Sequence, residues 1–354
     1  MIAALDIQVT KTAKSKIKEI DFNNLPFGKH FTDHMLEVDY VDGEWRKPVI
    51  RPFQSLSLSP ALSAIHYGQS IFEGIKAYKD RDGHPFIFRP YDNYRRFNIS
   101  AERMMMATVP EELFIEGMRR LVDLDRDWIP MKSDYSLYIR PFMFATDDTI
   151  GVHASEKYKF MILLSPTGPY YSAPMRIYVE DKFTRAARGG VGFAKAAGNY
   201  GGSMMATAVA KKRGFDQVLW MDAVEHKYVQ EIGTMNVFFV IGNKVVTPDL
   251  ESGTILEGVT RDSALEVLRQ EGYEVEERPV HIDDLVRAYQ AGELKEVFGT
   301  GTAATISLIK ELQYEDYTMK FDTDSWKAAP AVKRILMDIR EGSRADTHGW
   351  MFRV

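Results

Sequence analysis

The alternation of apolar and polar residues predicts several strands in the first half of the chain. Residues 36–41 alternate between the two kinds, as a half-buried strand does. The apolar runs at 135–144 and 159–164 are typical of buried strands. Residues 86–88 also predict a strand, which delivers Arg89 into a loop. The first half is therefore expected to contain a sheet.

Helical spacing of apolar residues predicts two helices in the same half. The first covers 92–106 with Asp92 as its N-cap, and the second covers 111–125. In the second half the same criteria predict strands at 218–221, 236–241 and 244–246 and helices at 261–271, 282–291 and 326–340. Strands and helices are mixed without regular alternation, which favours α+β or irregular α/β domains over a doubly wound sheet.

A proline-rich segment separates the two halves. Residues 165–174 hold three prolines and one glycine, which neither a helix nor a central strand is expected to accommodate. A chain of 354 residues is also too long for one ordinary core. The sequence therefore predicts a small α/β domain over 1–165, a linker over 166–177 and a larger domain over 178–354.

Composition narrows the function classes. The chain is 45% hydrophobic and 27% charged, and its formal net charge of -5 gives no electrostatic footprint for nucleic acid. No apolar run reaches the length of a membrane span, and residues 1–6 lack the basic start of a secretory signal. The absence of cysteine excludes disulfides, thiolate metal sites and cysteine nucleophiles. We therefore expect a cytoplasmic protein with no metal and no nucleic-acid or membrane partner.

Candidate chemistry lies in two segments of the second half. Lys195 is flanked by glycines and alanines, which let a ligand approach the backbone, and Tyr200 follows five positions later. Glu231 enters a Gly-Thr turn from an otherwise apolar strand. The amine can form a Schiff base, the phenol can bond a ring oxygen and the carboxylate can pair with a ring nitrogen. This combination suits pyridoxal 5'-phosphate, although a lone lysine is ordinarily a solvated surface residue.

These segments resemble those of the branched-chain amino-acid aminotransferases, which are fold-type IV pyridoxal-phosphate enzymes. The resemblance covers nearly the whole chain, with further landmarks at 27–35, 66–77, 136–141 and 348–352. It implies a two-domain α+β fold whose larger C-terminal domain is a pseudo-barrel. It also implies pyridoxal 5'-phosphate as cofactor and reversible transamination of L-leucine, L-isoleucine and L-valine with 2-oxoglutarate. It leaves open which of these three amino acids is preferred.

The resemblance assigns the cofactor contacts to residues whose chemistry fits. Lys195 would form the Schiff base, Tyr200 would bond the O3′ oxygen, and Glu231 would keep the ring nitrogen protonated. The phosphate would be bound by a guanidinium, two amides at the start of a helix and a turn hydroxyl, which belong to Arg89, Val259, Thr260 and Thr302. Taken singly, each of these four has an ordinary interpretation as a helix cap, a hairpin residue or a surface side chain.

The substrate residues are also implied by the resemblance. The walls of the side-chain pocket would be Phe31, Tyr67, Phe72, Tyr138, Tyr170 and Thr234. Arg140 would receive the γ-carboxylate of glutamate, and Ala304 would offer its main-chain amide. Ala304 and Ser307 stand where animal members carry a Cys-x-x-Cys pair, so thiol regulation is excluded. The resemblance implies a homodimer in which a loop, here about 150–152, reaches the partner's active site.

Other functions share some of these features. A D-amino-acid transaminase or an aminodeoxychorismate lyase has the same fold class, but such relatives are usually shorter and lack the segment at 27–34. A non-catalytic dimeric binding protein would keep the fold with an impaired cofactor set, whereas Lys195 and Glu231 are both present. The G-x-G-x-x-A pattern at 299–304 does not predict a nucleotide site, because too few residues follow it for further βαβ units.

Overall fold

The chain folds into two compact units. The computed structural model describes residues 5–170 and 173–354, so positions 171–172 of the predicted linker lie outside the described residues. The first unit comprises Met1–Tyr170, Ala194–Ala197 and Met337–Val354, and the second comprises Tyr171–Phe193 and Gly198–Leu336. Two segments that the sequence assigns to the larger domain thus group with the first unit. That the predicted ranges are separate domains, each able to fold on its own, stays a prediction.

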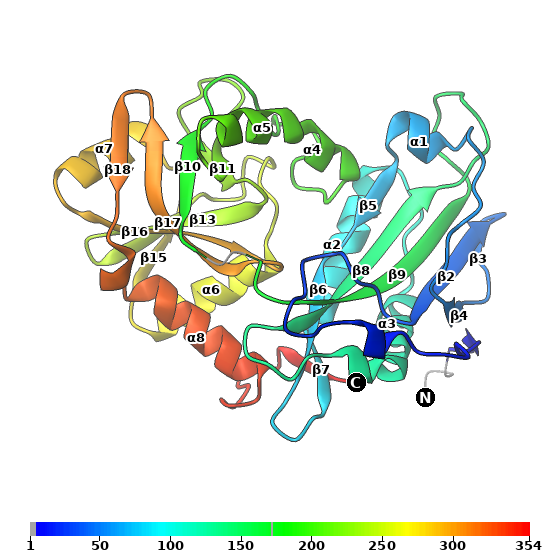
Figure 1. The fold of residues 1–354 in the computed structure, drawn as a ribbon. Coiled ribbons are helices and arrows are strands. Elements are labelled where there is room, and N and C mark those ends of the chain that lie inside the picture. Colours follow the sequence, from blue (N-terminus) through cyan, green and yellow to red (C-terminus); the bar gives the residue numbers. More distant parts are fainter. Residues whose placement is uncertain (1–4, 171–172) are drawn as a thin grey trace. The chain divides into compact units, whose positions relative to one another are not determined.

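A ten-stranded sheet forms the framework of the first unit (Figure 1). Its order is β1 (Gln8–Val9), β4 (Val49–Pro52), β2 (His34–Val41), β9 (Tyr158–Thr167), β8 (Ser136–Ala145), β6 (Ile75–Lys79), β7 (Pro85–Phe88) and β19 (Met351–Arg353), with β3 (Glu44–Trp45) beside β2 and β5 (Ser70–Phe72) beside β8. From β4 to β19 each neighbouring pair is antiparallel. The strands predicted in this half are confirmed, with ends that differ by a few residues.

Two helices pack on this sheet and complete the core of the first unit. They are α2 (Pro90–Arg103) and α3 (Glu111–Leu124). Phe97 of α2 and Phe114 of α3 meet at a ring distance of 5.4 Å, and both contact Phe160 of β9. Burial of these rings joins helix and strand in one apolar cluster. The short helices of the unit are α1 (Ser63–Tyr67), η1 (Ile17–Glu19) and η2 (Arg126–Trp128).

Helix α2 begins earlier than the sequence predicts. Pro90 is its first residue and Arg89 its N-cap, so Asp92 lies in the first turn and the predicted cap is wrong. The predicted loop after β7 is wrong as well, because Arg89 links the strand directly to the helix. Proline is favoured at the first helical position, since the N–H it lacks would have no partner within the helix.

Strand β9 includes Pro166, against the expectation that the proline-rich segment would interrupt the sheet. The described pairing of β9 with β2 runs from Tyr158 to Ile162, whereas its pairing with β8 continues to Thr167. Beyond Ile162 one edge of β9 is therefore not paired with β2. A proline is tolerated there because no described strand of the sheet pairs with that edge beyond Ile162 and requires an N–H donor from residue 166.

The second unit is built on a nine-stranded sheet. Its order is β12 (Val229–Ile232), β11 (Gln217–Met221), β10 (Met175–Val179), β17 (Thr305–Tyr314), β16 (Leu294–Gly301), β13 (Met235–Ile241), β14 (Lys244–Thr247) and β15 (Glu274–Glu277), with β18 (Tyr317–Lys320) beside β17. A further pairing between β12 and β13 closes the path from β12 to β13 into a ring. This closure confirms the predicted pseudo-barrel and, with the helices, the α+β class.

The remaining helices are α4 (Ala197–Gly202), α5 (Met204–Lys212), α6 (Val259–Gln270), α7 (Ile282–Gln290), η3 (Thr323–Ser325) and α8 (Ala328–Arg340). The predicted helices of the second half correspond to α6, α7 and α8. Leu285 and Val286 of α7 pack with barrel residues such as Phe239 in the core of the second unit. In the described part of the chain, no helix combines the length and the apolar character needed to cross a membrane.

Candidate active site

The main chain around Lys195 forms hydrogen bonds with other segments of the first unit. Phe72 N–H donates to Lys195 O at 3.1 Å, and a β-bridge joins Ile71 to Ala196. Lys195 N–H donates to the hydroxyl of Ser100 on α2 at 2.9 Å. The flanking alanines are buried, at 1% exposure each, which explains the small residues of this motif as close packing. These contacts account for the grouping of Ala194–Ala197 with the first unit.

The side chain of Lys195 lies beside an aromatic and cationic cluster. Its Nζ is 4.9 Å from the centroid of the Phe72 ring. The Arg140 guanidinium carbon is 4.6 Å from the same centroid, and Arg140 Nη2 donates to Tyr138 Oη at 3.0 Å. Arg140 Nε is buried and has no hydrogen-bond partner among the described residues. The structure thus brings together Lys195, Phe72, Tyr138 and Arg140, four residues that the sequence assigned to one site.

Phe27 extends this cluster to Tyr170. Its ring meets Tyr138 edge-on at 4.8 Å and Tyr170 edge-on at 5.0 Å. Tyr170 is 42% exposed, but the partial desolvation of its phenol and the neighbouring Tyr138 raise the pKa of this group, so Tyr170 stays protonated over a wide pH range. Gly74 lies beside the Tyr138 ring and is required there, because a Cβ at this position would overlap Tyr138 Oη. The sequence analysis did not single out Phe27, although it lies in the 27–35 landmark.

Phe31 and Tyr67 are placed in two other contacts of the first unit. Phe31 stacks on Phe53 with a centroid distance of 4.8 Å and an interplanar angle of 7°. The Tyr67 hydroxyl donates to the carbonyl oxygen of Ile150 and so ties α1 to the loop around 150. Their predicted role as pocket walls stays a prediction.

Glu231 lies on the barrel of the second unit. It pairs with Asn236 across the hairpin of β12 and β13, whose two-residue turn has Gly233 at φ 56°. Glu231 is 3% exposed, and its Oε1 accepts the N–H of Leu256 at 2.7 Å. A buried carboxylate in an apolar strand needs such partners to stay ionised.

Two neighbours of Glu231 were missed by the sequence analysis. Arg185 Nη2 lies 3.4 Å from Glu231 Oε1 and also donates to the carbonyl oxygens of Gly192 and Thr254. Asn236 Nδ2 donates to the carbonyl oxygen of Leu256 at 2.9 Å. Arg185 belongs to a loop without periodicity, so no signal in the sequence marks it. The polar Asn236 at the start of an apolar strand is a signal that could have been used.

The first turn of α6 offers the predicted anion site. The helix begins at Val259, two residues before the expected start, with Gly258 as its N-cap. Glycine is needed there, because a Cβ would overlap Asn236 Oδ1. Val259 and Thr260 are therefore the first two residues of the helix, at the end where main-chain N–H groups point outward. Those N–H groups and the helix dipole favour a bound anion.

The Gly-Thr pattern at 299–302 forms one side of a hairpin. Gly299 lies against Met235, since a Cβ there would meet Met235 Cε at 2.9 Å. Thr302 and Ala304 occupy the turn between β16 and β17, and Thr305 closes it in the left-handed region at φ 58°. Such a conformation is rare for a β-branched residue and is characteristic of functional turns. The glycines thus serve close packing, which agrees with the rejection of a nucleotide fold.

The last two cofactor candidates lie within α4 and at the N-terminal end of α2. Tyr200 is half-buried in α4, where its carbonyl oxygen accepts the hydroxyl of Ser203 at 2.8 Å. Arg89 has a left-handed backbone (φ 48°, ψ 50°), and its side chain is 10% exposed. Arg89 Nε donates to Asp92 Oδ2 at 2.8 Å. Burial would raise the pKa of the Asp92 carboxyl, but Arg89 and Arg95 lower it below its usual value.

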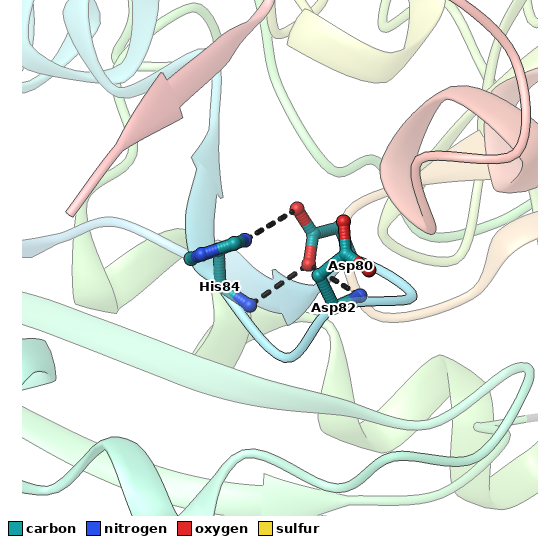
Figure 2. A group of neighbouring side chains, drawn as sticks. All are labelled: Asp80, Asp82 and His84. Carbon is teal, nitrogen blue, oxygen red and sulfur yellow. Dashed lines mark hydrogen bonds and ion pairs between the residues drawn. The ribbon is translucent and has the colours of Figure 1, made fainter.

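A second polar cluster lies in the turn between β6 and β7 (Figure 2). Asp80 Oδ1 accepts the N–H groups of Asp82 and His84 at 3.0 Å and 2.8 Å, and Oδ2 lies 3.2 Å from His84 Nδ1. Burial acts to raise the pKa of the Asp80 carboxyl, but these hydrogen bonds lower it. The turn also contains Gly83 at φ 83°. The cluster is thereby explained as turn structure, and we assign it no ligand.

Comparison with known proteins identifies the family. Residues 70–312 match the family described as amino-transferase class IV. The Bacillus subtilis branched-chain-amino-acid transaminase 1 is 50% identical over 98% of this chain and 99% of its own length. The Bacillus subtilis branched-chain-amino-acid aminotransferase 2 is 45% identical over 98% of this chain and 96% of its own length.

Solved structures agree with this match. The T.th. branched-chain amino acid aminotransferase complexed with N-(5'-phosphopyridoxyl)-L-glutamate is 27% identical, with a TM-score of 0.72 over 89% of this chain and 98% of that chain. A branched-chain aminotransferase from Thermoproteus uzoniensis shares the fold at 24% identity, with a TM-score of 0.74 over the same shares of the two chains. The chain with the Lys195 and Glu231 motifs therefore belongs to the branched-chain amino-acid aminotransferases of the class IV aminotransferase family.

Proposed function

We propose that the protein transfers amino groups reversibly between L-leucine, L-isoleucine or L-valine and 2-oxoglutarate, with pyridoxal 5'-phosphate as cofactor. The observation that carries the proposal is the Phe72 ring, which the Lys195 amine approaches at 4.9 Å and the Arg140 guanidinium at 4.6 Å. One aromatic side chain thus sets a nucleophilic amine beside a cation suited to a carboxylate. Amino-group transfer between an aliphatic amino acid and glutamate requires both groups.

The residues present fit the cofactor's phosphate. Val259 and Thr260 offer N–H groups at the start of a helix. The residue before them is Gly258, at a position where the structure has no room for a side chain. Arg89 supplies a fixed positive charge, and Thr302 adds a hydroxyl from a tight turn. The proposed phosphate ligands are therefore one cation, two main-chain amides and one hydroxyl.

The ring contacts follow from the chemistry of three side chains. When bound, the cofactor supplies an aldehyde carbon that takes up the amino group and a ring that withdraws electrons from the substrate. The carboxylate of Glu231, which is 3% exposed, would hold a proton on the ring nitrogen. Tyr200 would donate a hydrogen bond from its hydroxyl to the O3′ oxygen. Arg185, 3.4 Å from Glu231, favours the ionised carboxylate.

Lys195 moves the proton on which the reaction depends. Its Nζ would take the proton from the Cα of the amino-acid substrate and return it to C4′ of the cofactor, so the amine would act as base and then as acid. The main-chain contacts of Lys195 with Phe72 and Ser100 limit where Nζ can reach. A fixed amine favours one face of the substrate, so D-amino acids present their Cα hydrogen away from it.

The substrate pocket follows from the aromatic cluster. Phe72, Tyr138 and Tyr170 form apolar walls for an aliphatic side chain, with Phe31, Tyr67 and Thr234 as further proposed walls. The main-chain amide of Ala304 is proposed to bind substrate. Arg140 lies at the edge of the aromatic cluster, and its buried Nε is available to the γ-carboxylate of glutamate. The same pocket can therefore receive both substrates in turn.

We extend the proposal to a homodimer that works in the cytoplasm. The apolar side chains of Ile65, Ile150 and Val152 are 63%, 67% and 83% exposed, and the Tyr67 hydroxyl ties their two segments together. A local group of exposed apolar side chains is typical of an interface, and a second copy is the partner proposed here. The proposed partners are amino acids and 2-oxo acids, without nucleic acid or membrane, and the net charge of -5 gives no electrostatic footprint for nucleic acid. Light scattering should give about twice the chain mass of 40.4 kDa, and Val152→Asp should lower it.

Steady-state kinetics with the three L-amino acids, D-alanine and glutamate test the reaction. Apolar walls separate substrates that differ by one methylene by only about 1–3 kcal/mol, so the three efficiencies should lie within roughly 200-fold of one another. D-alanine should be essentially inert. D-alanine as the best donor would overturn the proposed function in favour of a D-amino-acid transaminase.

A further inference from the structure

Trp350 contacts Arg89 through both its backbone and its ring. Arg89 N–H donates to the carbonyl oxygen of Trp350 at 2.7 Å. The Arg89 guanidinium carbon lies 5.4 Å from the centroid of the Trp350 ring, which is within the range of a cation–π interaction. The next residue, Met351, pairs with Phe88 in the β7–β19 ladder. A segment near the C-terminus thus holds an arginine that lies more than two hundred residues earlier in the sequence.

The turn that presents Trp350 is itself well supported. Asp346 accepts the N–H of His348 at 3.1 Å through Oδ1 and that of Met351 at 2.7 Å through Oδ2. Gly349 takes a left-handed conformation at φ 68°, which glycine allows without strain. The His348 ring stacks on Trp350 at 4.0 Å with an interplanar angle of 11°, and Phe88 meets the same indole edge-on at 5.9 Å. These contacts fix the position of the indole.

Arg89 is held in a conformation that its own preferences do not favour. Its backbone is left-handed (φ 48°), a conformation that residues other than glycine adopt at an energetic cost. The hydrogen bond to Trp350 lies at this residue and stabilises the conformation. Asp92 binds Nε from within α2, while the indole faces the guanidinium. Asp92 and Trp350 therefore both help to set the direction of the guanidinium, and the Trp350 contact comes from the C-terminal turn.

We propose that Trp350 is a positioning residue for phosphate binding by Arg89. The inference rests on the proposed role of Arg89 at the cofactor phosphate. A guanidinium binds phosphate through a rigid, planar fork, so its affinity depends on orientation as well as on charge. Trp350 fixes this orientation before the ligand arrives, and its loss lowers the affinity for the phosphate group while leaving the rest of the cofactor's contacts unchanged.

The test compares ligands with and without a phosphate on the apoenzyme. Dissociation constants are measured for pyridoxal 5'-phosphate, for pyridoxal and for inorganic phosphate as a competitor, with the unsubstituted chain and with Trp350→Leu. Loss of a cation–π contact and of the orientation it gives should weaken the two phosphate ligands about tenfold. Pyridoxal should bind with a nearly unchanged constant. The thermal midpoint of each apoenzyme is recorded alongside.

Two further variants control for changes in the C-terminal strand. Phe352→Leu truncates the aromatic residue of β19, whose ring contacts Tyr91, and it should leave all three constants unchanged. Trp350→Phe keeps an aromatic face and should restore part of the lost phosphate affinity. If Trp350→Leu does not fold, Trp350→Met replaces it, because a flexible apolar side chain fills the same space more readily.

The outcomes separate this inference from the role of Arg89. If the Arg89→Ala variant still binds pyridoxal 5'-phosphate more tightly than pyridoxal by the same factor, Arg89 does not bind the phosphate, and this inference is overturned with that role. Loss of that preference in Arg89→Ala, but not in Trp350→Leu or Trp350→Met, would overturn the inference alone. An equal loss for pyridoxal and for its phosphate in the Trp350 variants would show a purely structural role and would also overturn it.

Discussion

The main-chain N–H of Lys195 donates to the Ser100 hydroxyl at 2.9 Å, and Ser100 in turn donates to the carbonyl oxygen of Arg96. Ser100 is completely buried, at 0% exposure, so water cannot replace either hydrogen bond. Helix α2, whose N-cap is Arg89, therefore also fixes the backbone of Lys195. Both positively charged cofactor candidates of the first unit depend on α2.

Ser100→Ala should destabilise the protein because it leaves a donor of the Lys195 segment without its acceptor. The cost of a buried unsatisfied donor is about 1–3 kcal/mol. Urea denaturation would measure it. Ser136→Ala is the matched control, because the buried Ser136 hydroxyl has no hydrogen-bond partner among the described residues, and it should be nearly neutral. Equal effects of the two substitutions would argue against the anchoring role of Ser100.

Lys195→Ala should abolish transamination while keeping a phosphate-dependent affinity for the cofactor. The amine provides both the covalent attachment and the proton transfer, and the latter alone accounts for about 100-fold or more in rate. Borohydride reduction of the unsubstituted enzyme followed by peptide mapping should label Lys195. Lys211→Ala, at an exposed lysine of α5, is the control and should keep full activity. Labelling of any other lysine contradicts the assignment.

Glu231→Gln should slow the reaction with little change in shape, because the glutamine oxygen can still accept the N–H of Leu256. A loss of about two pKa units at the ring nitrogen corresponds to about 3 kcal/mol, or roughly 100-fold in rate. Single-turnover measurement with L-leucine gives this number directly. Glu180→Gln, at another buried acid of the second unit, should leave the rate unchanged. Near-normal rates in Glu231→Gln would remove this residue from its proposed role.

Arg140→Met should affect glutamate and 2-oxoglutarate far more than leucine. A hydrogen bond to a charged group contributes about 1.5–3 kcal/mol, so the KM for glutamate should rise by roughly 10- to 150-fold. Leucine carries no γ-carboxylate and serves as the internal control in the same kinetic series. Arg51→Met, at a half-buried arginine paired with Glu37, controls for the loss of a positive charge in the first unit. A similar rise in KM for leucine would contradict the assignment.

Asp222 should stabilise the fold above pH 4 and lose this effect in acid. Burial would raise the pKa of its carboxyl, but hydrogen bonds from the N–H groups of Glu225, Tyr228, Lys227 and Val224 lower it to about 2. A lowered pKa favours the folded state above the unfolded-state pKa, and the gain disappears as pH falls through the folded-state value. Allowing for partial exposure, the contribution is about 1–2 kcal/mol.

The Asp222 turn joins β11 to β12, the strand that carries Glu231. Its contribution to stability can be measured with a variant that lacks the carboxylate charge. Asp222→Asn should be less stable than the unsubstituted chain at pH 7 by that amount. The difference should shrink between pH 4 and pH 2, as followed by urea denaturation. A difference that stays constant over this range would mean that the carboxylate charge does not stabilise the turn.

Local patterns in the sequence were sufficient to predict most of the strands and helices, because the spacing of apolar residues indicates which face of an element is buried. They failed where a distant element decided the outcome. Pro166 fits into β9 because its pairing with β2 ends at Ile162, and Asp92 is not a cap because Pro90 already starts the helix. Neither fact is visible in the spacing of neighbouring residues.

The candidate site shows the same division. The small residues around Lys195 and the turn after Glu231 are local signals, and both were found. Ser100, Arg185 and Asn236 act through contacts with segments that lie far from them along the chain, as the hydrogen bond from Lys195 to Ser100 illustrates. Spacing alone carries no information about such contacts. The resemblance to a family supplied several residues, such as Arg140, that local patterns would have left as ordinary side chains.

The most direct test of the proposed function is the first half-reaction with a single amino acid. The purified holoenzyme is mixed with L-leucine in the absence of a 2-oxo acid, while the absorbance of the bound cofactor and the released product are recorded. The yellow absorbance should fall, and about one equivalent of the branched 2-oxo acid should form per subunit, as ping-pong transamination requires. D-leucine should leave the spectrum unchanged. An unchanged spectrum with L-leucine, L-isoleucine and L-valine, or faster bleaching by D-alanine, would contradict branched-chain transamination by this protein.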